Sequence, residues 1–297
     1  MSALVSHESP PMKAMILAAG LGTRLRPLTD TRPKALVEIT GRTLLEITVT
    51  RLRAFGISEV IINVHHFADM VTDYLKSNNN FGMNVEISRE DILLDTGGGL
   101  KKAAWFFLEN TSPNESSRLD EPFLLHNVDV ISTIDFTRML QFHKEHHALA
   151  TLAVQARETS RPLLFDNHLQ LRGRRAGRDG KLELPRGHGP GSLRQGAASA
   201  APKDEKNRGT SAPEVPLQAL AFSGIHIISP RLLPMLSEEG IFSIIPAYLR
   251  LASQGEKILA FRADACYWRD LGRPADLTQA AFDFERKTLW GSERNLP

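Results

Sequence analysis

The sequence has a single cysteine, Cys266, among its 297 residues. One thiol excludes an intrachain disulfide and a zinc site built from several cysteines, and this cysteine usage is typical of a reducing compartment. No apolar run approaches the length of a membrane span, and residues 1–12 lack the apolar stretch of a signal peptide. We therefore expect a cytoplasmic protein with no membrane partner, in which residues 1–12 form a disordered tail.

An excess of charge of one sign is also missing. Lys and Arg number 36 against 34 for Asp and Glu, which gives a net charge of +2. Nonspecific binding to nucleic acid depends on a broad basic field, so nucleic acid is not an expected partner. The hydrophobic content of 42% is enough to bury a large core in one α/β domain.

What the sequence does contain is a regular alternation of short apolar runs with segments of helical period. Strands and helices are predicted in turn at residues 14–19, 44–55, 60–64, 67–75, 85–88, 100–108 and 123–128. This order predicts a Rossmann-like, doubly wound α/β fold with a mixed, mostly parallel sheet. In such folds ligands bind just beyond the carboxyl ends of the strands.

The second half of the chain is richer in strands. Further strands are predicted at 150–155, 163–165 and 220–228, and helices at 242–252 and 274–286. Residues 185–216 are dominated by Gly, Pro, Ala and Ser, and such a segment cannot bury enough apolar surface to offset the entropy of ordering it. We therefore expect one domain, residues 13–297, interrupted by a disordered insertion at 185–216.

The loop after the first predicted strand combines small residues with nearby cations. Its candidate nucleotide-binding residues are Leu17, Ala18, Ala19, Gly20, Gly22 and Thr23. Small residues let the backbone approach a ligand closely, and successive N–H groups can point at phosphate oxygens. Arg24 and Lys34 supply positive charge suited to a triphosphate. Two glycines on their own are more typical of an ordinary turn.

Two common nucleotide-binding motifs do not fit this loop. A dinucleotide fingerprint requires a third glycine where Leu25 stands, and an acidic residue where His65 and His66 follow the second main strand. A P-loop requires Gly-Lys-Ser/Thr, and nothing of that form follows Gly20. An NAD-dependent oxidoreductase and a P-loop ATPase are therefore both disfavoured.

Two carboxylates are candidate ligands for a metal ion. Asp129 and Asp270 each end an apolar segment. Magnesium commonly takes one or two protein carboxylates together with substrate phosphates. An aspartate at the end of a strand is more often a turn or capping residue, so these positions leave both interpretations open.

Several segments together resemble one family. The string from Leu17 to Leu28, followed by Pro33-Lys34, is similar to the signature of the sugar-1-phosphate nucleotidyltransferases. Residues 95–99 resemble the family's glycine-rich segment against base and ribose, 126–129 its metal-binding turn, and 268–274 its late motif with the second metal carboxylate. The details resemble bacterial proteins grouped with N-acetylmuramate-1-phosphate uridylyltransferases and mannose-1-phosphate guanylyltransferases.

The resemblance implies an enzyme that transfers a nucleoside monophosphate from UTP or GTP to a sugar 1-phosphate and releases pyrophosphate. It implies catalytic roles for Arg24, Lys34, Asp129 and Asp270, with Mg²⁺ held by the two aspartates. Gly97 and Gly98 join the loop residues as expected nucleotide contacts. The alternative is a nucleotide-binding regulatory protein that keeps the fold without catalysis, and the presence of all four catalytic candidates favours the enzyme.

The sequence departs from the family pattern at two places. Val128 stands where relatives have glycine before the metal-binding aspartate, so a positive φ is not expected there. The lysine that holds the sugar phosphate in many relatives has no clear equivalent. The possible substitutes are Arg161, Arg172, Arg174 and Arg175, and these arginines are equally well interpreted as solvated charges.

Four aromatic or titratable positions invite functional interpretations that we do not favour. His143, His146 and His147 share a helical face and are expected to be exposed to solvent, because no cysteine or carboxylate pattern accompanies them. Trp268 is expected to pack in the core or to form a wall of the site.

Overall fold

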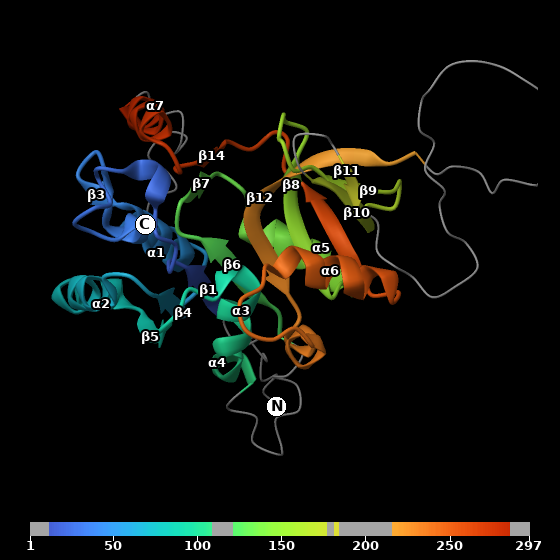
Figure 1. Cartoon of the computed structure of the whole chain (residues 1–297), viewed down its shortest axis with the longest axis horizontal. Helices are drawn as coiled ribbons and strands as arrows, with labels where there is room; N and C mark the ends of the chain where they lie inside the picture. The colour runs from blue at the N-terminus through green and yellow to red at the C-terminus, as the bar shows by residue number, and fades with distance from the viewer. Residues whose placement is uncertain (1–11, 109–120, 177–180, 184–215, 286–297) are drawn as a thin grey trace, which may run out of the picture.

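A computed structural model describes residues 12–108, 121–176, 181–183 and 216–285 (Figure 1). The predicted tail at 1–12 lies outside these residues except for Met12. The predicted insertion at 185–216 lies outside them except for Pro216. Both assignments therefore stay predictions.

The centre of the protein is one mixed sheet. Its strands are β1 (Ala14–Leu17), β4 (Glu59–Val64), β5 (Asn84–Arg89), β6 (Phe123–Asn127), β8 (Ala150–Gln155), β9 (Leu163–Phe165), β10 (Leu171–Ala176), β11 (Lys181–Glu183), β12 (Gln218–Ile228) and β13 (Ile258–Arg262). Their order is β11-β10-β9-β12-β6-β1-β4-β5, and β8 lies between β12 and β13. Tracing the pairings shows that β10 and β12 run opposite to the other strands of this sheet.

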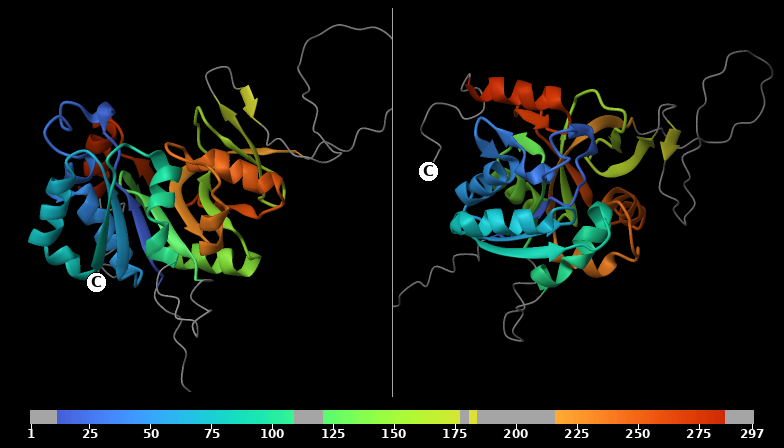
Figure 2. Two further views of the ribbon diagram at one scale, coloured as in Figure 1. Left: turned by 60° about the horizontal axis from the view of Figure 1, so that its bottom comes forward. Right: turned by 60° about the vertical axis from the view of Figure 1, so that its left-hand side comes forward.

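Helices cover both faces of this sheet (Figure 2). One face packs against α1 (Leu44–Ala54), α2 (Ala68–Ser77) and α5 (Phe136–His146), and the other against α3 (Asp95–Lys102), α4 (Ala104–Leu108) and α6 (Ile244–Ser253). The last helix, α7 (Pro274–Glu285), contributes Leu277 and Ala280 to the first core. Successive residues of β1 divide between the two cores: Ala14 and Ile16 belong to the first, and Met15 to the second. Strands buried on both faces read as continuous apolar runs, as the sequence shows. The predicted doubly wound α/β fold is confirmed.

Two short antiparallel ladders were not predicted from the sequence. One joins β2 (Glu38–Ile39) to β3 (Arg42–Thr43), and the other joins β7 (Val130–Ser132) to β14 (Trp268–Asp270). Segments of two or three residues carry no readable periodicity. The second ladder matters for function, because it brings a late part of the chain beside the end of β6.

The helix predicted at 100–108 begins earlier than expected. It starts at Asp95 as α3, includes the three glycines, and gives way to α4 at Ala104. Glycine disfavours a helix interior, so tertiary packing decides here. The N–H groups of Gly97 and Gly98 donate to the carbonyl oxygen of Phe242 at 2.9 and 3.1 Å. A Cβ atom on Gly98 would lie 2.5 Å from the carbonyl oxygen of Gly240, so the missing side chain lets α3 lie against that segment.

The prediction of solvent exposure is wrong for His143. Its Nδ1 lies 2.9 Å from Thr151 Oγ1 and its Nε2 lies 2.9 Å from Ser229 Oγ. The helical face of α5 that carries His143 packs on β8, and both ring nitrogens find hydroxyl partners there. Burial lowers the pKa of His143 to about 3. His146 and His147 are exposed, as expected.

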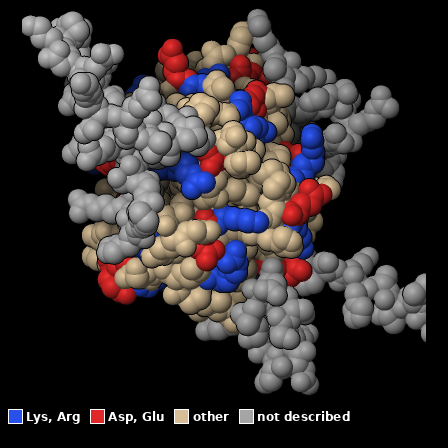
Figure 3. All heavy atoms as spheres, turned by 90° about the vertical axis from the view of Figure 1, so that its right-hand side faces the viewer, with Lys and Arg blue, Asp and Glu red and all other residues tan. Residues whose placement is uncertain are grey.

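The surface shows no sorting of charge on the face seen in Figure 3, where basic and acidic side chains lie interspersed. None of the described helices is long and apolar enough to cross a membrane.

Candidate active site

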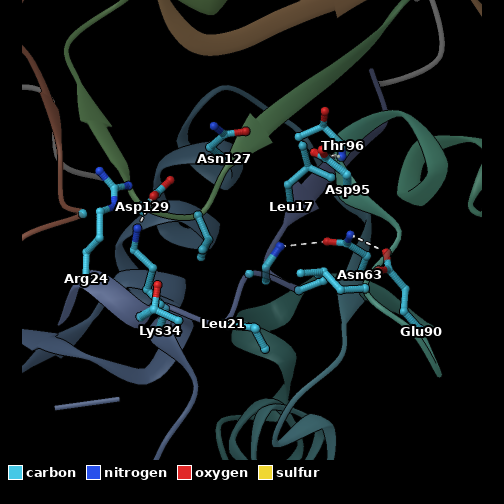
Figure 4. A pocket seen from close by; sticks show the side chains of 18 of the residues that line it. Leu17, Leu21, Arg24, Lys34, Asn63, Glu90, Asp95, Thr96, Asn127 and Asp129 are labelled. Atoms are coloured by element: carbon cyan, nitrogen blue, oxygen red, sulfur yellow. Dashed lines mark hydrogen bonds and ion pairs between the residues drawn. The ribbon is translucent and has the colours of Figure 1, made fainter. Parts of the chain in front are cut away.

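A cavity of about 520 Å³ opens at the carboxyl ends of β1, β4 and β6 (Figure 4). It lies where the predicted fold places ligands. Its walls are formed by Leu17, Ala18, Ala19, Gly20, Leu21, Gly22, Thr23, Arg24, Lys34, Asn63, Glu90, Leu93, Asp95, Thr96, Asn127, Val128, Asp129, Ile241 and Gly272. All six loop residues predicted to bind nucleotide are among them.

The loop after β1 owes its shape to Gly22. This residue has a φ of +65°, and a Cβ atom here would lie 2.9 Å from the methyl group of Thr29. Its carbonyl oxygen accepts hydrogen bonds from Leu25 N at 2.8 Å and from Thr29 Oγ1 at 2.9 Å. The turn starts a short 3₁₀ helix, η1 (Thr23–Leu25), which carries Arg24 at the edge of the cavity.

A buried polar network supports this loop from behind. Asn63 Oδ1 accepts a hydrogen bond from Ala18 N at 2.7 Å, and Asn63 Nδ2 donates to Glu90 Oε1 at 2.7 Å. Glu90 Oε2 accepts from Leu94 N at 2.9 Å. Buried polar groups with full partners hold a fixed geometry. Sequence reasoning missed both residues, although each stands at the end of a strand, where ligand-site residues were expected.

Lys34 and Asp129 form an ion pair across the cavity. Lys34 lies in the 3₁₀ helix η2 (Lys34–Leu36), and its side chain is 9% exposed. Asp129 stands in the turn between β6 and β7. Figure 4 shows Lys34 pointing at Asp129 with Arg24 beside them.

The ladder of β7 and β14 carries Asp270 to the same place. Asp270 pairs with Val130, and Leu271 N donates to the carbonyl oxygen of Asp129 at 2.8 Å. A Cβ atom on Gly272 would lie 2.5 Å from Arg24 Nη2 and 2.7 Å from Asp270 Oδ1. The guanidinium and the carboxylate therefore meet around Gly272, and the four predicted catalytic side chains come together.

The surroundings of Asp270 suit a cation. Its Oδ1 is buried and has no hydrogen-bond partner in the described structure. Burial, followed by the charge of Asp129, raises the pKa of Asp270 above its usual value, while Lys34, Arg24 and the backbone N–H of Gly272 oppose this shift. Two close carboxylates with an unpartnered oxygen fit a divalent cation. Within the described ranges, no cluster of three or more His, Cys, Asp or Glu side chains is placed to hold a metal.

Some predicted residues stand differently from expectation. Gly97 and Gly98 do not line the cavity, whereas the neighbouring Asp95 and Thr96 do. Thr96 Oγ1 accepts a hydrogen bond from Ile244 N at 3.0 Å, so this corner is joined to α6. Val128 makes its turn without a positive φ, as predicted. Its N–H instead donates to the carbonyl oxygen of Leu17 at 3.1 Å.

Fold and site together define an α/β enzyme that handles nucleotide phosphates. Residues 13–165 match the nucleotidyl transferase family. The N-acetylmuramate alpha-1-phosphate uridylyltransferase of Caulobacter vibrioides is 32% identical over 267 residues, which cover 89% of this chain and 93% of that protein. A mannose-1-phosphate guanyltransferase of Yarrowia lipolytica is 27% identical over 89% of this chain, and the match spans 62% of its own length.

Solved structures support the same fold. HddC from Yersinia pseudotuberculosis, complexed with GMP-PN, has a TM-score of 0.62 at 19% identity, covering 92% of this chain and 99% of that one. A UDP-glucose pyrophosphorylase complexed with UDP-glucose has a TM-score of 0.65 at 17% identity, covering 93% and 99%.

The chain belongs to the nucleotidyl transferase family, among the sugar-1-phosphate nucleotidyltransferases. The prediction of this family is confirmed, and with it the prediction of an enzyme that makes nucleotide sugars from a nucleoside triphosphate and a sugar 1-phosphate. Nothing in these comparisons favours a regulatory protein without catalysis.

Proposed function

We propose that this enzyme transfers UMP from UTP to an amino-sugar 1-phosphate of the N-acetylmuramate type, with Mg²⁺ as cofactor. One observation carries the chemistry: Arg24, Lys34, Asp129 and Asp270 converge at one end of a cavity whose other walls are the loop after β1 and the start of α3. The choice of substrates rests on the Caulobacter relative, which matches along nearly its whole length.

Transfer of guanylyl to mannose 1-phosphate is the second candidate. It is favoured by the Yarrowia relative, which also matches over 89% of this chain.

The proposed reaction is an in-line displacement at the α-phosphorus. A phosphate oxygen of the sugar 1-phosphate forms the new bond to this phosphorus, and the bond to the bridging oxygen of pyrophosphate breaks. The attacking oxygen is already anionic, so no side chain has to remove a proton from it. The protein contributes position and positive charge: loop amides and Arg24 face the leaving pyrophosphate, and Lys34 faces the reacting phosphates.

Asp129 and Asp270 are the proposed magnesium ligands. The unpartnered Oδ1 of Asp270 and the nearby Asp129 carboxylate fit such an ion. Bound there, magnesium would neutralise phosphate charge as it develops. In the described structure Lys34 forms an ion pair with Asp129. Release of Asp129 to the metal would free the ammonium group of Lys34 for the substrate phosphates.

A matrix of the four ribonucleoside triphosphates against a panel of sugar 1-phosphates tests the proposal. Pyrophosphate release with Mg²⁺ is the readout. We expect the highest rate for UTP with N-acetylmuramate α-1-phosphate. Higher rates for GTP with mannose 1-phosphate would favour the second candidate, and unchanged rates in the presence of a metal chelator would contradict the role of magnesium.

The predicted cytoplasmic location rests on the sequence alone.

A further inference from the structure

The proposed function names no positive group for the acceptor side of the site, the side that would bind the sugar 1-phosphate. Arg24, Lys34 and the loop amides serve the triphosphate in the proposed function, on which this inference rests. The sugar 1-phosphate brings a second phosphate toward an already anionic centre that also contains two carboxylates. A positive group on the side of Asp270 away from Arg24 and Lys34 would offset this repulsion.

The arginines that the sequence suggested for this task are engaged or exposed. Arg172 Nε lies 2.7 Å from Asp166 Oδ2, and Arg174 Nε lies 2.5 Å from Glu183 Oε2, so each already has a carboxylate partner. Arg161 and Arg175 are exposed. An exposed arginine must lose rotamer entropy and water to bind an anion, which makes it a poor fixed anchor.

Arg157, just after β8, is different because the structure already fixes its position. Its guanidinium carbon lies 3.6 Å from the centre of the Trp268 ring. Its Nη2 donates to the carbonyl oxygen of Phe222 in β12 at 2.7 Å. Its Nε is buried and has no hydrogen-bond partner in the described structure. A half-buried guanidinium thus keeps donors unused while one nitrogen and one face are held.

Trp268 connects this arginine to the reaction centre. Its Nε1 donates to the carbonyl oxygen of Ser223 at 2.7 Å, which fixes the ring against β12. Trp268 and Asp270 belong to the same short strand, β14, whose partner β7 follows Asp129. Residues two apart in a strand lie on the same face, so Trp268 and Asp270 share one face of β14. In agreement with this placement, burial lowers the pKa of Arg157 and the charge of Asp270 opposes the shift.

A half-buried guanidinium has lost part of its hydration, and an anion can satisfy donors such as the buried Nε that the protein leaves without a partner. Guanidinium groups bind phosphate through two parallel hydrogen bonds, and stacking on an aromatic ring orients them for this. We propose that Arg157, stacked on Trp268, binds the phosphate of the sugar 1-phosphate and so takes the place of the lysine that many relatives use.

The test compares Arg157→Gln with the wild-type enzyme and with Arg161→Ala. Glutamine removes the charge and, because its side chain is shorter, also the Nη2 hydrogen bond to the Phe222 carbonyl and the guanidinium stacking on Trp268. The KM for the sugar 1-phosphate that the wild-type enzyme uses best should rise about 10- to 100-fold, the loss expected for a charge-assisted hydrogen-bonding group. The KM for the nucleoside triphosphate should change by less than about 2-fold, because other residues hold it.

Two further measurements distinguish a loss of acceptor binding from a general loss of structure. Circular dichroism melting checks that the variants are folded, and equilibrium binding of UTP in the absence of acceptor checks the nucleotide side. Arg157→Lys keeps the charge without the planar fork, so it should recover part of the acceptor KM. Arg161→Ala should resemble the wild type.

The inference is overturned if folded Arg157→Gln keeps the acceptor KM of the wild type, if both substrate KM values rise together, or if Arg161→Ala has the larger effect. If the wild-type enzyme releases pyrophosphate with no combination of nucleoside triphosphate and sugar 1-phosphate, that result contradicts the proposed function itself. The two failures are therefore distinguishable.

Discussion

The nucleotide side and the acceptor side of the proposed active site are built in different ways. Most of the nucleotide side comes from one continuous stretch, residues 17–24, shaped by local hydrogen bonds around Gly22, and Lys34 and the start of α3 complete it. The acceptor side, as proposed, joins Arg157 after β8, Phe222 in β12 and Trp268 in β14, which are far apart in the sequence. The comparison teaches that a triphosphate site leaves a compact sequence signature, whereas an acceptor site made from tertiary contacts leaves almost none.

The reaction centre is where the two sides meet, so its carboxylates give the sharpest test. Asp129→Asn and Asp270→Asn should each lower kcat/KM about 100- to 1000-fold, because each removes charge that holds the metal. Pyrophosphate release measured across magnesium concentrations is the readout. Asp73→Asn changes an exposed carboxylate of α2 and serves as the control. A folded Asp270→Asn variant with full activity would contradict the role of Asp270 at the point where the nucleotide and acceptor sides meet, because only the nucleotide side would then be needed.

A pH titration probes the packing of β6, β12 and α5, the elements between the nucleotide side and the acceptor side. His126 in β6 and His226 in β12 lie where these strands pair, and His143 joins α5 to the same region. Burial is the main cause that lowers their pKa values, to about 4 for His126 and about 3 for His226 and His143. All three are neutral in the folded protein near pH 7.

The sign follows from where protons bind. In the unfolded chain these histidines titrate near pH 6.5, so below this pH the unfolded state takes up protons that the folded state refuses. Their contribution to stability is present above pH 6.5 and is lost as the pH falls toward 4. At pH 5 each histidine should favour unfolding by about 2 kcal/mol. Urea unfolding between pH 7.5 and 4.5 measures this, and His143→Gln should flatten the dependence. A curve as steep in that variant as in the wild type would contradict burial of a neutral His143.

The junction between α3 and the segment before α6 gives a smaller effect. Gly98→Ala places a Cβ atom 2.5 Å from the carbonyl oxygen of Gly240, so we expect a loss of about 1–3 kcal/mol in the free energy of unfolding. Gly20 has no atom within 4 Å of its position for a Cβ, and Gly20→Ala should therefore keep wild-type stability in the same urea titration. Equal stability of both variants would mean that α3 does not depend on this close approach.

The smallest expected effect concerns one hydrogen bond at the same junction. Thr96→Val removes the hydroxyl that accepts from Ile244 N, and a neutral hydrogen bond contributes about 0.5–1.5 kcal/mol. Thr96→Ser keeps the hydroxyl and is the matched control. Thermal melting of both variants would distinguish loss of the bond from loss of the methyl group, which only the serine variant lacks.

The sequence predicted well whatever depends on local pattern. The alternation of strands and helices is regular enough to place β1, α1, β4, α2 and β6, and the loop after β1 follows from its small residues. Asn63 and Glu90 could not be assigned as partners, because their contact depends on the alignment of β4 with β5. The glycines of α3 were read as ligand contacts, and their packing against Phe242 comes from a segment about 140 residues later. Arg157 was missed because only β12 and Trp268 distinguish it from an ordinary surface arginine.

The position of β12 has a consequence for how the protein is made. The family match ends at residue 165, yet β6 and β8 both pair with β12, whose strand begins only at Gln218. On a ribosome, the first half therefore emerges with open strand edges at β6 and β8. Open edges invite pairing with other chains, and this risk lasts until β12 is synthesised. Nascent or truncated chains that stop near residue 165 should accordingly aggregate or recruit chaperones, although they contain the whole segment by which the family is recognised.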